Sequence, residues 1–447
     1  MLLLGIDIGS SFIKLWVMDL DSGSAVFERS SSTPEFLDTT GPKREIPMQK
    51  LISLVKKMIN EALSLYAVEG IGLSVQMHGF ELFNNRGALN DFVSWQDMRA
   101  VGVDGRQDIA ASLRSIAGDY LFRRNGVELR NSHSICPLYH LLREKDLYEP
   151  CNFAMMGDSL IRHLTGNIVP IHPTVAASSG LYDLEKEDWN HELIALLSLD
   201  HICFPKVSME REASTYYNFN GRLIPIYTAV GDHQAAVLGS GAMDGDVVIN
   251  IGTGGQISFV DNALSFDDNY ETRPFFSGRT LRALTQLYSG RALDVLMKLV
   301  LDVGQNVYGL NTEAGPELWE KINDLAQEAE KNLLDRELEI NMSFFNPEGG
   351  LIGDINTGNL RVANIFLAAY RNMAECYYRA LKQLGLETSS LNSIIGAGGV
   401  LHKTTLLQRL MAERFGLELK ISPGSEDVML GLLRLGRWHL HINPGIL

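Results

Sequence analysis

The sequence predicts an α/β protein with two related lobes, and three observations support this prediction. Apolar residues have strand spacing over residues 2–8, 12–18 and 71–75, and helical spacing over residues 48–66. The strand–turn–strand pattern of the first 18 residues returns from residue 249. No Pro- or Ser-rich linker divides the chain, so we expect the two lobes to pack closely.

Length, composition and charge limit the class of protein. The 447 residues are 45% hydrophobic and 21% charged, which is typical of a globular protein of two or three domains. The formal net charge is −15, and an acidic surface repels phosphate backbones, so we expect no nucleic-acid partner. Binding of one nucleotide stays open, because it needs only a local group of backbone amides and a few cations.

The cysteines and the first residues indicate a cytoplasmic protein. No CxxC pair occurs, so neither a zinc site nor a redox dithiol is indicated. The apolar residues 1–4 run directly into Gly5-Ile6-Asp7 without a cleavage site, which favours a strand over a signal peptide. No apolar run approaches the roughly 20 residues of a membrane span, so we expect no membrane partner.

Two segments repeat one pattern. IDIGSS (6–11) and INIGTG (249–254) each end a predicted strand in a turn of small residues, and a second strand follows each turn. The repetition favours a duplicated fold with one phosphate-binding turn in each lobe. Two unrelated hairpins remain an alternative, because Gly-Ser and Gly-Thr turns are common.

The first turn has the residue types that phosphoryl transfer requires. Backbone N–H groups of Gly9, Ser10 and Ser11 can face phosphate oxygens, and Lys14 follows closely enough to reach the same phosphates. Asp7, at the strand end, is placed to hold Mg²⁺ or its water shell. The alternative is that Asp7 only caps backbone amides at the end of a hairpin.

Two later glycine-rich segments are further candidates for nucleotide binding. Gly252, Thr253 and Gly254 form a turn whose spacing differs from the GxxxxGKS/T of a P-loop. Residues 394–400 are a strand that breaks into glycines before a helix predicted over 404–415, and a helix N-terminus favours phosphate. The spacing is not the GxGxxG of a dinucleotide site, and a purely structural loop stays open.

Polar clusters that follow predicted strands are candidates for a sugar site. Sugars require convergent hydrogen-bonding groups and an aromatic face, whereas a lone His or Trp is more often structural. The clusters are Gln76-Met77-His78 and Trp95-Gln96-Asp97. Asp232 and His233, in GDHQAA (231–236), open an Ala-rich helix; Asp232 is either a helix N-cap or the base that accepts a hydroxyl proton.

In this order, the segments resemble the FGGY family of carbohydrate kinases within the actin-like ATPase superfamily. The resemblance is carried by GIDIGSSFIK (5–14), GDHQAAVLGSG (231–241), INIGTGG (249–255) and GAGGVLHKTTLLQRLMAERFG (396–416). It implies two actin-like (ribonuclease H-like) lobes from an internal duplication, with a central interlobe cleft. Residues 1–241 would form the sugar-binding lobe and residues 242–447 the nucleotide-binding lobe.

The resemblance also implies a role for each matching residue, with ATP and Mg²⁺ as cofactors. Asp232 would be the general base and Asp7 the metal-associated carboxylate. The implied sugar-binding residues are Gln76, Met77, His78, Trp95, Asp97 and His233. The implied ATP-binding residues are Gly9, Ser10, Ser11, Lys14, Gly252, Thr253, Gly254, Gly290, Gly398, Gly399 and Lys403.

The substrate implied by the resemblance is a ketose of five to seven carbons. Glycerol-specific members carry Arg-Glu where this chain has Met77-His78. VSWQDMR (93–99) and the segment 275–296 are more similar to sedoheptulose-specific than to xylulose-specific members, which places sedoheptulose ahead of xylulose. His402, Lys403 and the bulky helix 427–433 depart from the family pattern and leave the nucleotide preference open.

Two other functions stay open on this fold. One is a catalytically inactive sugar- or ATP-sensing protein, which would not need Asp232. The other is a chaperone- or filament-type actin relative, which would have no reason for His78 and Trp95. The sequence does not fix the oligomeric state, so a homodimer is also left open.

Overall fold

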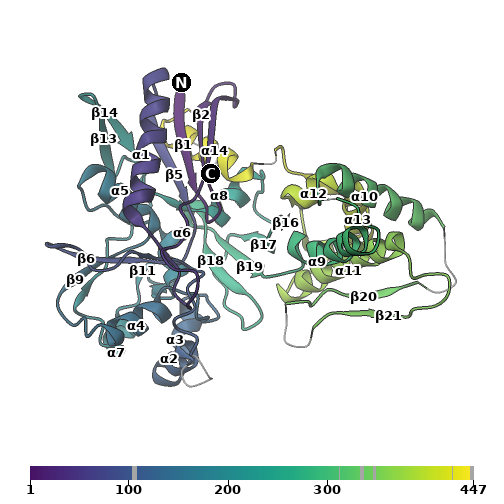
Figure 1. The fold of residues 1–447 in the computed structure, drawn as a ribbon. Coiled ribbons are helices and arrows are strands. Elements are labelled where there is room, and N and C mark those ends of the chain that lie inside the picture. Colours follow the sequence, from purple (N-terminus) through teal and green to yellow (C-terminus); the bar gives the residue numbers. More distant parts are fainter. Residues whose placement is uncertain (103–107, 312, 333–336, 346–348, 425, 443–447) are drawn as a thin grey trace. The chain divides into compact units, whose positions relative to one another are not determined.

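The computed structural model describes residues 1–102, 108–311, 313–332, 337–345, 349–424 and 426–442, and the chain divides into two compact units (Figure 1). Unit 1 contains Met1–Gly239, Asn262–Leu281 and Glu426–Leu447. Unit 2 contains Ser240–Asp261 and Arg282–Ser425. The expected division after residue 241 lies close to the first crossing, but the chain then returns to unit 1 twice.

The main sheet of unit 1 carries the N-terminal hairpin at its centre. Its strand order is β13-β14-β5-β1-β2-β3, and β15 also pairs with β5. The central strand β1 is antiparallel to β2 and parallel to β5. These strands are β1 (Leu2–Ile8), β2 (Phe12–Asp19), β3 (Ala25–Ser32), β5 (Gly70–Val75), β13 (Thr215–Phe219), β14 (Arg222–Ile226) and β15 (Val230–Gly231). The strands predicted over residues 2–8, 12–18 and 71–75 are therefore confirmed.

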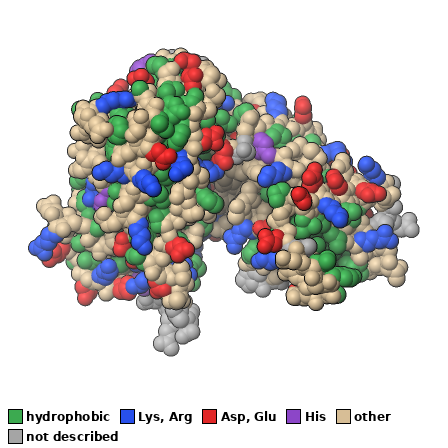
Figure 2. All heavy atoms as spheres, turned by 45° about the horizontal axis from the view of Figure 1, so that its top comes forward, with side chains coloured by type: hydrophobic (Ala, Val, Ile, Leu, Met, Phe, Trp, Pro, Cys, Tyr) green, Lys and Arg blue, Asp and Glu red, His purple; other side chains and the backbone are tan. Residues whose placement is uncertain are grey.

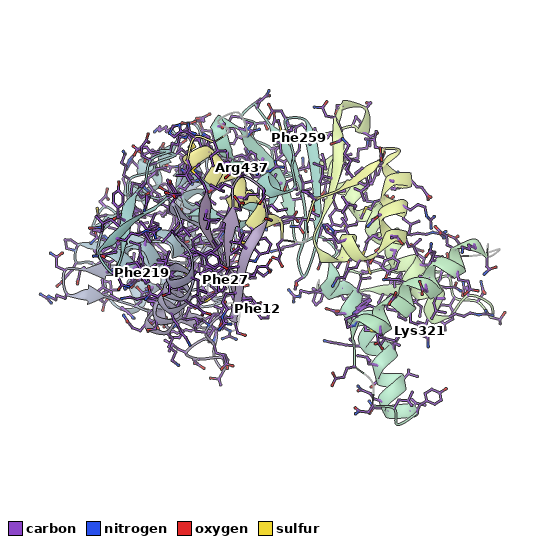
Figure 3. The ribbon with its side chains drawn as sticks, turned by 90° about the horizontal axis from the view of Figure 1, so that it is seen from above. Phe12, Phe27, Phe219, Phe259, Lys321 and Arg437 are labelled. Carbon is purple, nitrogen blue, oxygen red and sulfur yellow. The ribbon has the colours of Figure 1, made fainter. Side chains whose placement is uncertain are left out.

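Helices α1 (Met48–Leu65), α8 (Asp232–Gly239) and α14 (Asp427–His439) pack against this sheet. Helix α1, predicted over 48–66, buries apolar residues at spacings of three and four along its length. Helix α8 packs against α14, which also contacts β1 and β5. Arg437, labelled in Figure 3, extends the attachment of α14, since its Nε donates to the carbonyl of Leu20 at 2.7 Å.

Two glycines let α8 and α14 approach backbone to backbone. A Cβ on Gly239 would lie 1.7 Å from the carbonyl oxygen of Asp427, and a Cβ on Gly431 would lie 2.0 Å from that of Ala235. Neither distance is sterically allowed, so both positions require glycine.

The rest of unit 1 is a smaller α/β layer. It contains a sheet of order β12-β9-β6-β7 and two short strand pairs, β4-β8 and β10-β11. The strands are β4 (Glu45–Ile46), β6 (Glu81–Asn84), β7 (Gly87–Ala88), β8 (Phe92–Val93), β9 (Cys151–Ala154), β10 (Tyr182–Asp183), β11 (Asp188–Trp189) and β12 (Ile202–Cys203). Strand β18 (Glu271–Pro274) also belongs to unit 1, but it pairs with β19 (Thr280–Thr285) at the edge of the six-stranded sheet β18-β19-β17-β16-β22-β23. The helices are α2 (Ile109–Ala117), α3 (Asp119–Arg124), α4 (Ile135–Glu144), α5 (Met156–Thr165), α6 (Pro173–Ala176) and α7 (His191–Leu196).

Unit 2 repeats the strand order of unit 1. Its central strand β16 is antiparallel to β17 and parallel to β22, and the order β23-β22-β16-β17-β19 matches β14-β5-β1-β2-β3. The sheet strands are β16 (Asp246–Ile251), β17 (Gly255–Asp261), β19 (Thr280–Thr285), β22 (Ser393–Ala397) and β23 (Leu419–Ile421); β20 (Glu339–Asn341) pairs with β21 (Leu351–Gly353). The helices are α9 (Gly290–Asp302), α10 (Pro316–Lys331), α11 (Val362–Gln383), α12 (Gly399–Lys403) and α13 (Thr405–Phe415). The matching orders support the predicted duplication.

The surface carries both signs of charge. Lys and Arg side chains are interspersed with Asp and Glu over the face drawn in Figure 2. Within the described residues, no helix combines the length and apolar character that crossing a membrane requires.

Candidate active site

Parallel strands bring three predicted site segments of unit 1 to one edge of its sheet. In the pairing of β1 with β5, Ile8 lies opposite Val75, and in the pairing of β15 with β5, Gly231 lies opposite Val75. The residues that follow these strands are therefore neighbours: the turn at Gly9, the polar segment at Gln76, and Asp232. The carboxyl edge of a parallel sheet is where α/β proteins usually bind ligands.

Asp7 lies one residue before this edge and has an unusual environment. Its Oδ1 is buried and has no hydrogen-bond partner within the described part of the chain. Burial, and secondarily the nearby Asp232 carboxylate, raise the pKa of Asp7 to about 7. A buried, unpartnered carboxylate oxygen is a suitable cation ligand.

The predicted association of Asp7 with Mg²⁺ fits this chemistry. Among the described residues, no group of three or more His, Cys, Asp or Glu side chains is arranged to hold a metal ion. Mg²⁺ commonly takes only one or two carboxylates from the protein and completes its octahedron with water and substrate phosphate. A single carboxylate at the sheet edge is sufficient for that mode of binding.

Asp232 is the first residue of α8. Its Oδ1 accepts a hydrogen bond from the backbone N–H of His233 at 2.7 Å. Burial raises the pKa of Asp232 to about 6, although the His233 N–H and the Arg273 guanidinium act in the opposite direction. A carboxylate with a pKa close to neutral pH is suited to general-base catalysis, because it is ionised and still basic enough to take a proton.

The segment after β5 supplies polar groups that lack partners inside the protein. Within the described residues, neither amide atom of the buried Gln76 side chain has a hydrogen-bond partner. Met77 is buried, and its Sδ would lie 2.7 Å from a Cβ at Gly231. His78 has a φ of 58°, a left-handed conformation that is rare outside glycine.

Hydrogen bonds fix the protonation of His78. Its Nδ1 lies 2.8 Å from the carbonyl oxygen of Ser178, which can only accept, so Nδ1 carries the ring proton. Its backbone N–H donates to the Ser178 hydroxyl at 3.0 Å. Burial lowers the pKa of His78 to about 3, so the ring is neutral at neutral pH.

The sequence did not predict the charged residues near His233, which are Arg273, Glu271 and Arg130. Arg273 donates from Nη1 to Nδ1 of His233 at 2.8 Å and from Nη2 to Glu271 at 2.6 Å. Arg130 lies 3.3 Å from the same Glu271, whose pKa these cations lower to about 2 despite its burial. Because arginine can only donate, Nδ1 of His233 is an acceptor, and the neutral ring carries its proton on Nε2.

Glu271 and Arg273 line a small cavity, and Gln234, two residues after Asp232 on α8, also lines it. The lining includes Met77, His78, His133, Ser178, Gln234 and Arg273. The rings of His78 and His133 meet edge to face at 4.9 Å. One feature of the sequence could have indicated these charged residues. Glu271 and Arg273 are two positions apart, and on a strand this spacing places their opposite charges on the same face.

Trp95 and Asp97 differ in their surroundings. Trp95 is 39% exposed. Asp97 is fully buried, and both of its oxygens accept hydrogen bonds from the Arg99 side chain, at 2.7 and 2.8 Å. Its Oδ2 also accepts from the backbone N–H of Arg44 at 2.6 Å. The Asp97 carboxylate is thus engaged in an internal ion pair.

The first glycine turn is short and partly exposed. The backbone N–H of Gly9 donates to the carbonyl of Phe12 at 3.1 Å, and the Gly9 carbonyl accepts from the Thr33 hydroxyl at 2.8 Å. Phe12 projects outward from the start of β2 and is labelled in Figure 3. Lys14 lies opposite Asp7 in the β1–β2 pair and forms an ion pair with Glu426.

The predicted nucleotide residues of unit 2 form a second, glycine-rich cluster. The backbone N–H of Gly290 donates to the Gly252 carbonyl at 2.9 Å, and the Ser289 hydroxyl donates to the Thr253 carbonyl at 2.8 Å. Gly398 has a φ of 83° and approaches the end of β16. The structure therefore brings Gly252, Gly290 and Gly398 together.

The remaining predicted nucleotide residues lie on or beside this cluster. Thr253 and Gly254 are exposed, and Gly399 and Lys403 are the first and last residues of α12. His402, which departs from the family pattern, places Nε2 2.9 Å from the Ser422 hydroxyl.

Similarity to solved structures identifies the fold of this protein. Structural neighbours include a ligand-bound xylulose kinase from Lactobacillus acidophilus (18% identity, TM-score 0.82) and a Plasmodium falciparum glycerol kinase with ADP (13% identity, TM-score 0.82). Each similarity covers 100% of this chain and 90% of the other. The fold is therefore the two-domain, actin-like ATPase fold that the sequence predicted.

Sequence comparison gives the family. The N-terminal domain of the FGGY family of carbohydrate kinases matches residues 2–239, and the chain belongs to this family. Curated relatives include a xylulose kinase of Staphylococcus xylosus, 24% identical over 284 residues that cover 60% of this chain and 56% of the relative. Another is glycerol kinase 5 of Xenopus laevis, 25% identical over 293 residues that cover 58% and 59%. The chain thus spans somewhat more than half the length of these relatives.

Proposed function

We propose that this protein is an ATP- and Mg²⁺-dependent sugar kinase in which Asp232 is the general base. The observation that carries the proposal is the meeting of Asp7, Gln76 and Asp232 at the carboxyl edge of one sheet. These positions combine two carboxylates of raised pKa with buried polar atoms that lack protein partners. Such groups are typical of a ligand site and unusual in a purely structural core.

In the proposed reaction, a sugar hydroxyl lies beside Asp232, which takes its proton as the oxygen bonds to the γ-phosphorus of ATP and the bond from that phosphorus to ADP breaks. Gln76 offers both a donor and an acceptor to neighbouring hydroxyls. His78 and His233 are neutral and held in single tautomers, so each contributes fixed hydrogen-bonding groups. Phosphoryl transfer depends mainly on such positioning, because its loose transition state requires little covalent assistance.

Asp7 is the proposed ligand of Mg²⁺ or of its water shell, and the bound Mg²⁺·ATP supplies the phosphoryl group. Gly9, Ser10, Ser11 and Lys14 are the proposed phosphate contacts of unit 1. In unit 2, the proposed nucleotide contacts are Gly252, Thr253, Gly254, Gly290, Gly398, Gly399 and Lys403. That the turns at Gly9 and Gly252 hold one triphosphate stays a prediction from the sequence.

The proposed substrate is a ketose of five to seven carbons, either sedoheptulose or xylulose. Relatives and structural neighbours named as xylulose kinases support a ketose, whereas those named as glycerol kinases make glycerol the obvious competitor. Met77, His78 and His233 are the proposed substrate contacts beside Gln76, and Trp95 is proposed as the aromatic face. Asp97 is the weakest of the predicted contacts, because Arg99 occupies its carboxylate.

A coupled ADP-release screen tests this proposal. Sedoheptulose, xylulose, glycerol and representative aldoses are each supplied with ATP, with and without Mg²⁺. We expect one ketose to stimulate ADP release strongly, and only with Mg²⁺. Slow ATP hydrolysis that no sugar stimulates would contradict a kinase and favour a sensing protein instead.

A further inference from the structure

A second cavity of unit 1 lies apart from the lining around His78. Its volume is about 310 Å³, whereas the cavity beside His78 and Arg273 has about 10 Å³. A volume of about 10–15 Å³ holds one water molecule, and ligand sites start at about 300 Å³. The larger cavity is lined by His172, Val230, Phe276, Trp438 and His439, with the partly exposed Met209 also in its lining.

His172 contributes a hydrogen-bond donor to this cavity. The ring is more than nine-tenths buried and caps α6, because its Nδ1 accepts the backbone N–H of Thr174 at 3.2 Å. Burial lowers the pKa of His172 to about 3, so the ring is neutral and carries its single proton on Nε2. Within the described structure, that Nε2–H has no hydrogen-bond partner, although His172 lines the cavity.

His439 contributes the complementary acceptor. Its Nδ1 lies 2.6 Å from the carbonyl oxygen of Arg211, which can only accept, so Nδ1 carries the proton and Nε2 has a lone pair. Burial lowers the pKa of His439 to about 4, which keeps this ring neutral as well. The ring also stacks on Tyr227, with centroids 3.8 Å apart, so its orientation is fixed.

The other lining residues indicate the polarity and charge of a ligand that would fit this cavity. Trp438 and Phe276 offer aromatic surface, and Ser277 and Thr228 offer hydroxyl groups. Among the described lining residues, Glu210 carries the only formal charge at neutral pH, and that charge is negative. Lys206 pairs with Glu210 at 3.0 Å and Arg211 packs over the Trp438 ring, but neither cation is a lining residue, so a phosphate group would meet no cation in the lining itself.

We propose that this cavity is a second binding site, which takes a neutral monosaccharide. Hydroxyl groups donate and accept equally well, so neighbouring hydroxyls of one sugar ring satisfy both the Nε2–H of His172 and the Nε2 lone pair of His439. The apolar face of the ring packs on Trp438. This inference goes beyond the kinase proposal, because binding here requires neither ATP nor phosphoryl transfer.

The walls of the cavity connect it to the candidate active site. Val230 begins β15, two residues before Asp232, which begins α8. Thr174, next to the α6 cap, accepts the backbone N–H of Gly231 at 3.0 Å. A bound sugar would therefore stabilise the segment that positions Asp232, and we expect it to act as an effector.

Isothermal titration of the full chain without nucleotide tests the proposal, with D-glucose, D-xylose, D-fructose, glucose 6-phosphate and adenosine as probes. We expect at least one neutral sugar to bind, and binding to weaken about tenfold in His172→Asn. Asn retains an acceptor for the Thr174 N–H and removes only the Nε2 donor. His439→Asn likewise keeps a donor for the Arg211 carbonyl, and the exposed His191→Asn is the matched control, with unchanged affinity.

A variant at Met209 provides an independent test in case the histidine variants fail to fold. Met209→Trp fills the cavity from a partly exposed position, and we expect it to abolish sugar binding. The proposal is overturned if no neutral sugar binds, if only glucose 6-phosphate or adenosine binds, or if Gln76→Leu abolishes binding while the cavity variants do not. Failure of the kinase proposal is separate, since it would appear as sugar binding without ADP release.

Discussion

The two central hairpins of the molecule have the same topology and different chemistry. In unit 1, β1 is antiparallel to β2 and parallel to β5; in unit 2, β16 has the same relations to β17 and β22. The equivalent positions in IDIG and INIG are Asp7 and Asn250. Asp7 keeps an unpartnered buried carboxylate oxygen, whereas the Asn250 amide lies against Gly398.

The strands next to these hairpins continue the contrast. Polar side chains follow β5, at Gln76 and His78, but glycines follow β22, at Gly398 and Gly399. A duplicated backbone can thus present side chains in one unit and backbone groups in the other. We infer that the first unit selects and activates the acceptor, and that the second unit binds the nucleotide mainly through close backbone approach.

Replacing Asp232, the proposed base in unit 1, should have the largest effect. We expect Asp232→Ala to lower kcat by about 10²–10⁴-fold, the range of general acid–base catalysis. The wild-type rate should rise with pH through about 6, because Asp232 must lose its proton to act. Steady-state kinetics from pH 5 to 8 measures both, with the exposed Asp200→Ala as control. Near-normal turnover in Asp232→Ala would remove this residue from the role.

The glycine cluster of unit 2 offers a matched pair. A Cβ at Gly398 would lie 2.4 Å from Asn250 Oδ1 and 2.6 Å from the Ile251 carbonyl, and φ there is +83°. At Gly399, a Cβ meets nothing within 4 Å. We expect Gly398→Ala to lower the free energy of unfolding by about 2–4 kcal/mol, and Gly399→Ala to leave it nearly unchanged.

Chemical denaturation measures the free energies of unfolding of both variants. The KM for ATP then shows whether a substitution affects nucleotide binding and not only stability. If Gly399 faces the nucleotide, Gly399→Ala should raise this KM in a stable protein. Equal stabilities of the two variants would contradict the close approach of Gly398 to β16.

Converting Asp7 to the residue found in the other hairpin sharpens the comparison. The folded-state pKa of Asp7, about 7, exceeds its unfolded value, so the folded protein binds more protons between about pH 4 and 7. Stability from this group therefore falls as the pH rises through that window. We expect Asp7→Asn to raise the free energy of unfolding at pH 8 by on the order of 1–3 kcal/mol while abolishing activity.

Denaturation at pH 4 and pH 8 checks this sign, since the gain should disappear at the lower pH. A gain of the same size at both values would show that the Asp7 carboxylate is not the cause. Asp200→Asn, at an exposed position, should have no effect at either pH.

The smallest effect should come from the ion pair beside the first turn. Lys14 and Glu426 are each about one-third exposed, so their attraction contributes at most about 1 kcal/mol. We therefore expect the free energies of unfolding of Lys14→Met and Glu426→Gln to differ from the wild-type value by no more than about 1 kcal/mol. If Lys14 binds phosphate, only Lys14→Met should raise the KM for ATP, and equal KM values would exclude that contact.

Local sequence patterns predicted several strands, several helices and the glycine turns, because each of these depends on neighbouring residues. The 48–66 periodicity and the IDIGSS and INIGTG turns are examples, and the structure confirms their secondary structure. The hydrogen bond between Arg273 and His233 could not be predicted, because it joins residues 40 positions apart through the packing of β18. The return of residues 262–281 and 426–442 to unit 1 is likewise determined by tertiary packing.

Asp97 shows that a contact between near neighbours in the sequence can also escape prediction. Its position after a short strand suggested a ligand contact, but Arg99, only two residues later, occupies it. The periodicity of the segment gave no sign of this pairing, because both charged side chains are buried. Burial of an ion pair depends on the surrounding layers, which no local pattern describes.

The close crossing of α8 and α14 has a consequence for how the protein is made. Asp232 begins α8, but the helix that locks α8 in place is synthesised about 190 residues later, after all of unit 2. During translation the nascent chain can complete the second unit while the first still lacks α14. The packing that holds the segment at Asp232 can therefore be completed only after unit 2 has been synthesised.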